Sequence, residues 1–251
     1  MSGEAARAVL VTGASRGIGA AVAHAFAAAG DRVAVHYGSR REQAQRVAAA
    51  LPGDGHAVVG AELGDADAVR EMVGAAVAAL GRIDVLVNNA GIFEPHPITE
   101  TSYEDWQAAW QRTLTVNLVA AANVTWCAVR HMGRGGRIVN VGSRGAFRGE
   151  PTHPAYGAAK AGLVALGQSL ARALAPKGIA VTSVAPGFTE TDMAAEALAG
   201  EEGAERRAES PLGRVATPEE VAAAVLYLAS PQAEFTSGTV LDINGASHLR
   251  L

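Results

Sequence analysis

The chain has 251 residues, of which 49% are hydrophobic and 18% charged, and its formal net charge is −4. This composition is typical of a folded globular protein and excludes a disordered chain. A slightly acidic balance offers no basic field to a nucleic acid, so we expect no such partner.

The first residues and the cysteine content indicate in which cellular compartment the protein is expected. The single Cys127 cannot form an intrachain disulfide, and we interpret it as a small buried residue on a helix. Residues 1–7 lack the apolar core of a signal peptide. No uninterrupted apolar segment reaches the roughly 18 residues that a membrane-spanning helix needs. We therefore expect a cytoplasmic protein that does not enter the membrane.

From residue 8 onwards, short apolar segments alternate with longer helical patterns. Strands separated by helices and apolar on both faces predict a parallel sheet that is covered on both sides. No linker, repeat or charge block interrupts the pattern, so we predict one doubly wound α/β domain over residues 1–251. The predicted strands are 8–12, 32–37, 56–61, 83–88, 136–142, 179–185 and 239–243, and the predicted helices are 17–29, 41–51, 66–80, 103–131, 155–175 and 218–229.

A glycine-rich loop joins the first predicted strand to the first predicted helix. Gly13, Gly17 and Gly19 follow Thr12 in this loop. Backbone amides at the start of a helix suit a pyrophosphate, and glycines let the chain and the ligand approach closely. Three glycines at some fixed spacing are common by chance in a chain with 29 of them, and the spacing departs from Gly-x-Gly-x-x-Gly. The strand before the loop and the helix after it therefore carry the prediction of a dinucleotide site.

Tyr156 and Lys160 lie four residues apart in a predicted helix, on the same face. A fixed cation beside a phenol favours the phenolate and lowers the phenol's pKa towards the working range. Because Lys160 and Lys177 are the only two lysines, a chance match to this pair is expected only about 0.03 times. We infer that Tyr156 is a general acid or base and that Lys160 lowers its pKa.

Ser143 ends the fifth predicted strand, 13 residues before Tyr156. A hydroxyl there can hold a carbonyl oxygen and stabilise it as it becomes an alkoxide. The chain lacks a Gly-x-Ser-x-Gly elbow, and no histidine or acid is placed to activate Ser143 as a hydrolase nucleophile. Ser143 is therefore predicted to orient a carbonyl group.

Taken in order, these motifs resemble the short-chain dehydrogenase/reductase family over residues 8–245. The resemblance implies a Rossmann fold whose seven-stranded parallel sheet has the order 3-2-1-4-5-6-7, with helices on both faces. It also implies hydride transfer between a nicotinamide and a ketone or secondary alcohol. Residues 186–193 and 241–245 are most similar to the 3-oxoacyl-(acyl-carrier-protein) reductase branch. The motifs are Thr-Gly-x-x-x-Gly-x-Gly from Thr12, Asn88-Asn89-Ala90-Gly91, Asn117, Ser143, Tyr156-x-x-x-Lys160 and Pro186-Gly187.

The resemblance also implies roles for individual residues. Asn117 would use its side-chain amide to hold a water behind Lys160, and so pass protons to solvent. Asn88 would only support the sheet. The implied catalytic residues are Asn117, Ser143, Tyr156 and Lys160. The implied cofactor contacts are Gly13, Ser15, Arg16, Gly17, Ile18, Gly19, Tyr37, Ser39, Arg40, Glu62, Leu63, Asn89, Ala90, Gly91, Tyr156, Lys160, Pro186, Gly187, Thr189 and Thr191.

The end of the second predicted strand distinguishes NADP from NAD. An NAD site usually offers a carboxylate to the ribose about 20 residues after the glycine loop. Residues 36–41 contain no acid. A 2′-phosphate would instead meet Arg16, Ser39 and one of Arg40 or Arg41, and guanidinium groups bind phosphate well. We therefore predict NADP(H).

The substrate is less determined by the sequence. The polar segment 188–211 suits a mobile lid over the substrate, or equally a pair of surface helices. The first choice is a 3-oxoacyl thioester carried on acyl carrier protein or CoA, with Arg134 and Lys177 as basic residues near the pocket rim. The alternative substrate is a free ketone, sugar or other secondary alcohol.

Three further expectations concern class, assembly and metals. An NADP-binding regulator without turnover is disfavoured, because a pure binder does not need proton-handling groups. The family resemblance implies a homotetramer built from the two long helices and the last strand. The seven histidines show no paired ligand spacing, so we expect no metal. His96 and His153 are expected to be exposed loop residues.

Overall fold

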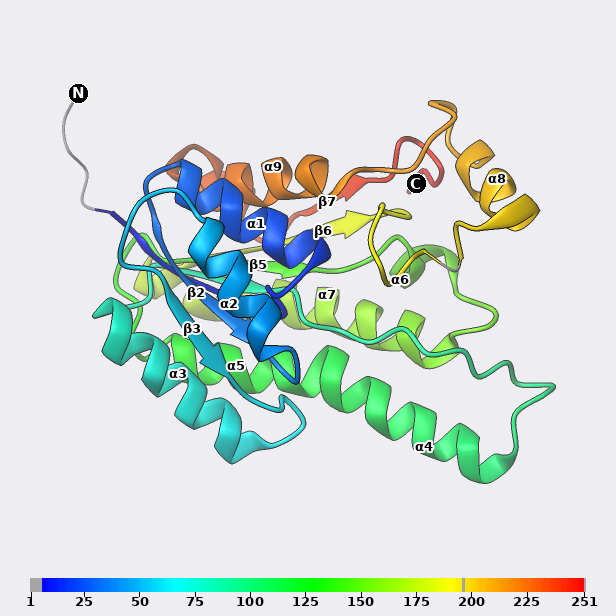
Figure 1. Cartoon of the computed structure of the whole chain (residues 1–251), viewed down its shortest axis with the longest axis horizontal. Helices are drawn as coiled ribbons and strands as arrows, with labels where there is room; N and C mark the ends of the chain where they lie inside the picture. The colour runs from blue at the N-terminus through cyan, green and yellow to red at the C-terminus, as the bar shows by residue number, and fades with distance from the viewer. Residues whose placement is uncertain (1–5, 196, 251) are drawn as a thin grey trace.

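The computed structural model describes residues 6–195 and 197–250. Its strands form one seven-stranded parallel sheet in the order β3-β2-β1-β4-β5-β6-β7, which confirms the predicted fold class (Figure 1). The strands are β1 (Ala8–Val11), β2 (Arg32–Tyr37), β3 (Ala57–Gly60), β4 (Val85–Asn88), β5 (Arg137–Val141), β6 (Ala180–Pro186) and β7 (Val240–Ile243).

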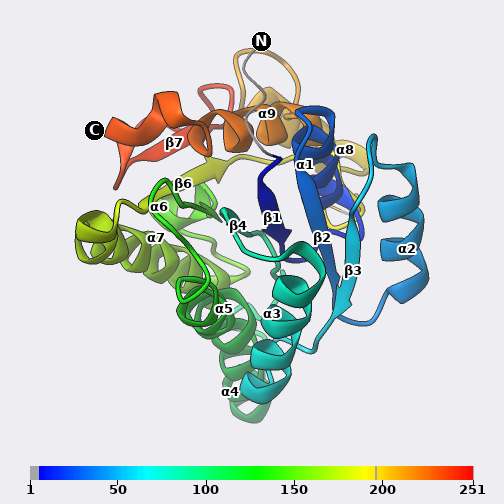
Figure 2. The ribbon, with the colours of Figure 1, turned by 90° about the vertical axis from the view of Figure 1, so that its left-hand side faces the viewer.

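Helices cover both faces of the sheet in two layers (Figure 2). Side chains alternate between the faces along a strand, so Val9 and Val11 pack in one apolar cluster while Ala8 and Leu10 pack in the other. One layer contains α1 (Gly17–Ala28), α2 (Arg41–Ala50) and α9 (Pro218–Leu228); the other contains α3 (Ala66–Leu80), α4 (Tyr103–Leu114), α5 (Ala120–Ala128) and α7 (Pro154–Leu174).

The register of the sheet brings the carboxyl ends of its central strands together. Val11 pairs with Val87, Asn88 with Asn140, and Val141 with Val184. The loops that follow β1, β4, β5 and β6 therefore meet at one edge. In doubly wound sheets this edge, where the strand order reverses, is the place for a ligand.

The helix predicted over residues 103–131 is interrupted. A π-helical turn over Thr115–Val119 separates α4 from α5. Periodicity does not signal such a turn, because the apolar pattern continues on both sides of it. Turns of this kind are rare and often occur at functional sites, and this one contains Asn117.

Short helices also appear outside the six main predicted helices, and α8 agrees with the surface-helix alternative for residues 188–211. The four-residue α6 (Gly145–Arg148) follows β5, and α8 (Gly200–Ala208) lies in the segment 188–211. Figure 1 shows α8 beyond the carboxyl ends of β6 and β7, apart from both helix layers. Two 3₁₀ helices cover Ala175–Lys177 and Pro231–Thr236. No helix in the described part of the chain has the length and hydropathy to cross a membrane.

Candidate active site

The glycine loop leaves no room for larger residues. Gly13 and Gly17 have φ values of 64° and 54°, which favour glycine. At Gly19, a Cβ atom would collide with the Gly13 carbonyl oxygen and lie 2.5 Å from Nδ2 of Asn89. The Asn89 amide donates to the carbonyl oxygens of Thr12 and Gly13 at 2.9 and 3.1 Å. The loop after β4 thus fixes the loop after β1, and their amides and small residues form a cradle for a pyrophosphate.

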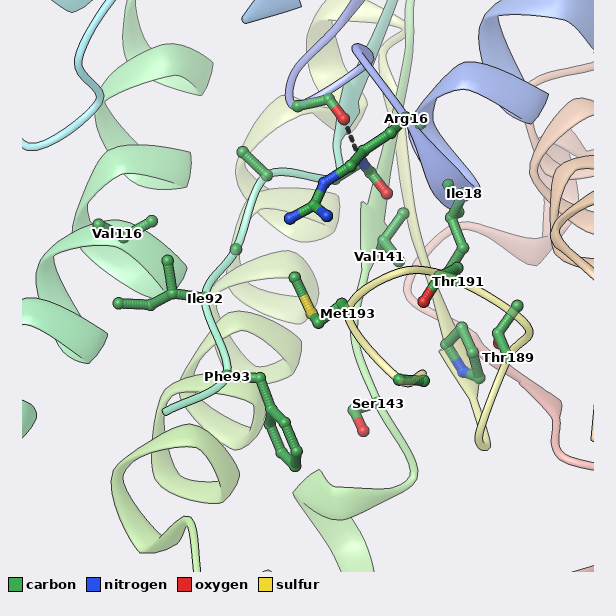
Figure 3. Close-up of a pocket in the computed structure, with 18 of the residues that line it drawn as sticks. Arg16, Ile18, Ile92, Phe93, Val116, Val141, Ser143, Thr189, Thr191 and Met193 are labelled. Atoms are coloured by element: carbon green, nitrogen blue, oxygen red, sulfur yellow. Dashed lines mark hydrogen bonds between the residues drawn. The ribbon is translucent and has the colours of Figure 1, made fainter. Parts of the chain in front are cut away.

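A cavity of about 400 Å³ runs from this loop to the ends of β5 and β6. In Figure 3, Arg16 lies towards one end of the view and Phe93 towards the other, with Met193 between them. The cavity brings together predicted residues from the segments that follow β1 to β6 and from the first turns of α7. Those lining it are Gly13, Ser15, Arg16, Gly17, Ile18, Gly19, Ser39, Arg40, Glu62, Leu63, Asn89, Ala90, Gly91, Ser143, Tyr156, Lys160, Pro186, Gly187, Thr189 and Thr191.

Tyr37 is the predicted cofactor contact that does not line the cavity. Its ring covers Gly60, where a Cβ atom would lie 2.6 Å from Cζ of Tyr37. Its neighbour His36 lines the cavity instead, because consecutive side chains of a strand point to opposite faces. The Tyr37 side chain therefore lies away from the cavity that the other predicted cofactor contacts line.

His36 is a buried histidine that the sequence reasoning missed. Its Nδ1 accepts a hydrogen bond from the Gly13 amide at 3.0 Å, and its Nε2 lies 3.2 Å from the Ala61 carbonyl oxygen. Because a carbonyl only accepts, the ring proton is on Nε2 and the imidazole is neutral. Burial lowers the pKa of His36 to about 4, which keeps it neutral. A polar residue within an otherwise apolar strand was the available signal.

Arg16 ends the glycine loop and reaches towards the segment after β6. Its guanidinium forms an ion pair with Asp192 at 3.2 Å. Arg16, Ser39 and Arg40 all line the cavity. This arrangement offers two guanidinium groups and a hydroxyl to a phosphate.

Ser143, Tyr156 and Lys160 meet at the ends of β5 and α7. Lys160 is buried, and its Nζ donates to the Val141 carbonyl oxygen at 2.7 Å. The ammonium lies 5.6 Å from the centre of the Tyr156 ring. The Ser143 hydroxyl accepts a hydrogen bond from the Gly145 amide at 3.0 Å. A phenol, an ammonium and a hydroxyl from two elements thus share one wall of the cavity.

The pKa of Tyr156 is raised, whereas the sequence predicted that it would be lowered. Burial raises it to about 12; a hydrogen bond with Ser143 lowers it and the Glu150 carboxylate raises it further. Burial also lowers the pKa of Lys160 to about 8. The sequence predicted that attraction between the Lys160 ammonium and the Tyr156 phenolate would lower the pKa of Tyr156. The loss of solvation is the larger effect, because both groups are enclosed and the ammonium is directed at the Val141 carbonyl oxygen.

Asn117 does not occupy the role expected of its amide. Its Oδ1 accepts from the Ile92 amide at 2.8 Å and its Nδ2 donates to the Ile92 carbonyl oxygen at 2.9 Å. The side chain is therefore engaged with the loop after β4 and does not line the cavity. It still lies behind Gly91, where a Cβ atom would be 3.1 Å from Asn117 Oδ1 and 3.6 Å from Lys160 Nζ. Asn88, as expected, supports the sheet through Thr125 and Asn140.

The two loop histidines were wrongly expected to be exposed. His96 is buried, and its Nε2 accepts from the Ala155 amide at 3.1 Å, which fastens the first turn of α7. His153 is half-buried and stacks on Phe93 with ring centres 3.6 Å apart. Phe93 in turn meets the Tyr156 ring edge-on at 4.8 Å. Burial lowers the pKa of His153 to about 4, so this aromatic wall is uncharged.

An ionic cluster that the sequence did not reveal borders the substrate end of the cavity. Arg144 is buried, forms an ion pair with Glu209 and donates to the Ser247 hydroxyl. Arg148 pairs with the same Glu209 at 3.2 Å and lies 3.8 Å from Glu150. Arg144 and Glu150 both line the cavity.

Arg134 and Lys177 lie at the opposite edge of the sheet. Arg134 precedes β5 and its side chain packs beside Gly178, while Lys177 precedes β6. Both are therefore at the amino ends of strands, whereas the cavity opens at the carboxyl ends. The expectation that they border the pocket was wrong, because linear order does not say at which end of a strand a loop lies.

Two other features complete the description of reactive side chains. Cys127 is a half-buried free thiol that packs against the cluster beneath α3, α5 and α7. Within residues 6–195 and 197–250, no group of three histidine, cysteine, aspartate or glutamate side chains is placed to hold a metal ion.

Comparison with known proteins identifies the family of the chain. A family model described as Enoyl-(Acyl carrier protein) reductase matches residues 13–248. A cis-4-hydroxycyclohexanecarboxylate dehydrogenase of Sinomonas cyclohexanicum is 41% identical over 246 residues, which are 96% of each chain. A 3-oxoacyl-(acyl-carrier-protein) reductase of Synechocystis sp. is 37% identical over 248 residues, which are 98% of each chain.

Solved structures share the fold over the same length. The crystal structure of a short-chain dehydrogenase from Burkholderia cenocepacia in complex with NADP is 38% identical, with a TM-score of 0.88 over 96% of this chain and 97% of that chain. The chain therefore belongs to the short-chain dehydrogenase/reductase family of oxidoreductases.

Proposed function

We propose that the protein transfers a hydride between NADP(H) and a ketone or secondary alcohol. The observation that carries this proposal is the arrangement of Ser143, Tyr156 and Lys160 along one cavity that continues to the glycine loop. Bound NADPH would supply the hydride. The cradle around Gly13 and Gly19, where a Cβ atom would meet Ala90, Asn89 and backbone, fits a dinucleotide.

In the proposed reaction, this chain's residues handle the carbonyl oxygen. The Ser143 hydroxyl holds that oxygen, and Tyr156 donates its proton as the oxygen becomes an alkoxide. An alkoxide is a stronger base than a phenolate, so a phenol with a pKa of about 12 still protonates it. Lys160 holds the nicotinamide ribose, and Asn117 holds the backbone of Ile92 in place behind Lys160.

The choice of NADP rests on charge. Arg16, Ser39 and Arg40 line the cavity, and residues 36–41 contain no carboxylate. The NADP complex of the Burkholderia cenocepacia relative supports the same choice. Arg16→Ala should reduce the preference for NADPH over NADH by about tenfold, the loss of one charged phosphate contact.

Two substrate classes remain candidates. A 3-oxoacyl thioester is supported by the 3-oxoacyl-(acyl-carrier-protein) reductase among the relatives. A free ketone or secondary alcohol is supported by the position of Arg134 and Lys177, which leaves the pocket rim without the expected carrier contacts. The cis-4-hydroxycyclohexanecarboxylate dehydrogenase among the relatives acts, by its name, on such an alcohol.

We also propose a cytoplasmic homotetramer. Large apolar side chains on α5 and near β7 are exposed, among them Trp126 at 58% and Phe235 at 104% of their full surface, and patches of this kind often mark interfaces. Light scattering of the purified chain tests the assembly, and a monomer at micromolar concentration would contradict it.

The experiment that tests the activity follows NADPH absorbance with acetoacetyl thioesters and with small ketones. Tyr156→Phe should lower kcat by about 10²–10⁴-fold while NADPH affinity stays within a few-fold. If the wild-type protein binds NADPH but reduces no carbonyl compound, the result would instead support the alternative of an NADP-binding regulator without turnover. A Tyr156→Phe variant with near wild-type turnover would refute the mechanism.

A further inference from the structure

Glu150 is an acidic side chain at the substrate end of the cavity that the proposed mechanism does not use. It lines the same cavity as Ser143, Tyr156 and Phe188. Its side chain is 13% exposed, and the chain makes space for it. A Cβ atom at Gly145 would lie 2.5 Å from the Glu150 Oε1 atom, so only glycine at position 145 admits the carboxylate in this place.

The carboxylate of Glu150 has unused hydrogen-bonding capacity. Among residues 6–195 and 197–250, its one ion pair is with Arg148 Nε at 3.8 Å, which is longer than a hydrogen bond. The neighbouring Glu209 carboxylate, in contrast, receives both Arg144 and Arg148. A carboxylate enclosed this far normally accepts several hydrogen bonds. Because Glu150 lines the cavity, a donor that enters it can reach this carboxylate.

The surrounding charges select the kind of donor. Arg144 and Arg148 face Glu150 and Glu209, so two positive charges balance two negative ones. A substrate ammonium or carboxylate would leave an unbalanced charge in a partly desolvated site. A hydroxyl donates a hydrogen bond to the carboxylate and adds no charge. Phe93 also lines the cavity and stacks on the uncharged His153, so its ring can hold the carbon frame of such a substrate.

We propose that Glu150 determines substrate specificity by accepting a hydrogen bond from a substrate hydroxyl on the same carbon frame as the reacting carbonyl. The preferred substrates are thus hydroxylated ketones and the diols that correspond to them. This inference rests on the proposed oxidoreductase function and names the substrate class of the same site. A site built around a hydroxyl discriminates against the analogue that lacks it, because a buried acceptor is then left unpaired.

The first experiment compares kcat/KM for cyclohexanone with that for 2-, 3- and 4-hydroxycyclohexanone, with NADPH. Wild type should prefer at least one hydroxylated ketone by about tenfold or more. Glu150→Met, which keeps the length of the side chain, should abolish the preference, measured as the ratio of the kcat/KM values for the hydroxylated ketone and cyclohexanone. Glu150→Gln, which keeps an acceptor oxygen, should retain part of it. Glu209→Gln is the matched control, since it removes a charge from the same cluster without lining the cavity, and it should keep the preference.

A second measurement separates this inference from the activity. Calorimetry of the corresponding cyclohexanediols and of cyclohexanol with the NADP-loaded Tyr156→Phe variant reports binding without turnover. Tighter binding of a diol that is lost with Glu150→Met supports the inference even if no ketone is reduced, in which case only the proposed function fails. Equal binding of diols and cyclohexanol would overturn the inference. Tighter binding of aminocyclohexanols than of diols would also overturn it, because the partner of Glu150 would then be an ammonium and not a hydroxyl.

Discussion

The two ends of the cavity are built in different ways. At the cofactor end, the wall includes the closely packed glycine loop, where Asn89 and His36 both hydrogen-bond to Gly13 and Gly19 leaves no room for a side chain. At the substrate end, the walls are large side chains from four segments: Phe93 after β4, Arg144 after β5, Glu150 before α7, and Phe188 after β6.

This difference separates what is general from what is specific. A pyrophosphate is recognised by amides and a helix dipole, which any sequence with the right glycines can present. A substrate is recognised by the shape and charge of side chains, which depend on how several loops pack together. The Tyr156 and Lys160 pair lies between these ends, and the following experiments perturb first the pair, then the cofactor end.

Lys160→Met should give the largest change in stability. Burial lowers the pKa of Lys160 from 10.5 to about 8, so enclosing the charged form costs roughly 3 kcal/mol below pH 8. Between about pH 8 and 10.5 the unfolded chain holds the proton and the folded protein does not, so wild-type stability rises with pH in this range. The variant should be more stable than wild type at pH 7, and its advantage should shrink as the pH rises through this range.

Urea unfolding at pH 7 and at pH 10 measures the Lys160→Met difference. Lys177→Met is the matched control, because Lys177 is exposed, and it should change stability little at either pH. A Lys160→Met variant that is no more stable than wild type at pH 7 would mean that the ammonium is better solvated than its surroundings indicate.

Gly19→Ala should damage the cofactor end and spare the sheet. The added methyl group collides with the Gly13 carbonyl oxygen and the Asn89 amide, and such overpacking costs roughly 1–3 kcal/mol. NADPH affinity, measured by fluorescence titration, should fall accordingly. Gly74→Ala is the control: no atom lies within 4 Å of a Cβ there, and alanine in helix α3 should stabilise by about 0.5–1 kcal/mol. Unchanged NADPH affinity in Gly19→Ala would contradict the described loop.

His36→Leu should act through the glycine loop. It removes the acceptor of the Gly13 amide and the donor to Ala61, and leaves a buried amide unpaired, so NADPH affinity should fall about tenfold, or ~1.4 kcal/mol. His36→Asn, whose Oδ1 can replace Nδ1, should lose less. A positioning role predicts a higher KM for NADPH with kcat nearly unchanged. Equal losses in His36→Leu and His36→Asn would show that the volume of the ring matters, and not the hydrogen bond.

Asp192→Asn should have the smallest effect. The Arg16–Asp192 pair at 3.2 Å is largely exposed, and such pairs contribute less than about 1 kcal/mol. The variant should leave unfolding stability nearly unchanged. If Arg16 is the phosphate ligand, its release from Asp192 should tighten NADPH binding by up to a few-fold and leave NADH binding unchanged. Weaker NADPH binding would contradict that role.

The sequence by itself determined the sheet and the cofactor end. Alternating strands and helices predicted a parallel sheet, and the family resemblance implied its strand order. The position of Gly13, Gly17 and Gly19 directly after a strand predicted the close-packed loop at the start of α1, because it depends on local backbone geometry. The motif residues Ser143, Tyr156 and Lys160 were also found, since strand ends and one helical turn bring them to one place.

Tertiary packing decided the rest. It turned His36 towards the cavity in place of Tyr37, engaged Asn117 with Ile92, and buried His96 beneath α7. It also enclosed the Tyr156 phenol, so that desolvation raised a pKa that pairwise charge alone would have lowered. Burial and long-range contacts depend on how distant segments fold against each other, and no periodic pattern in the sequence indicates them.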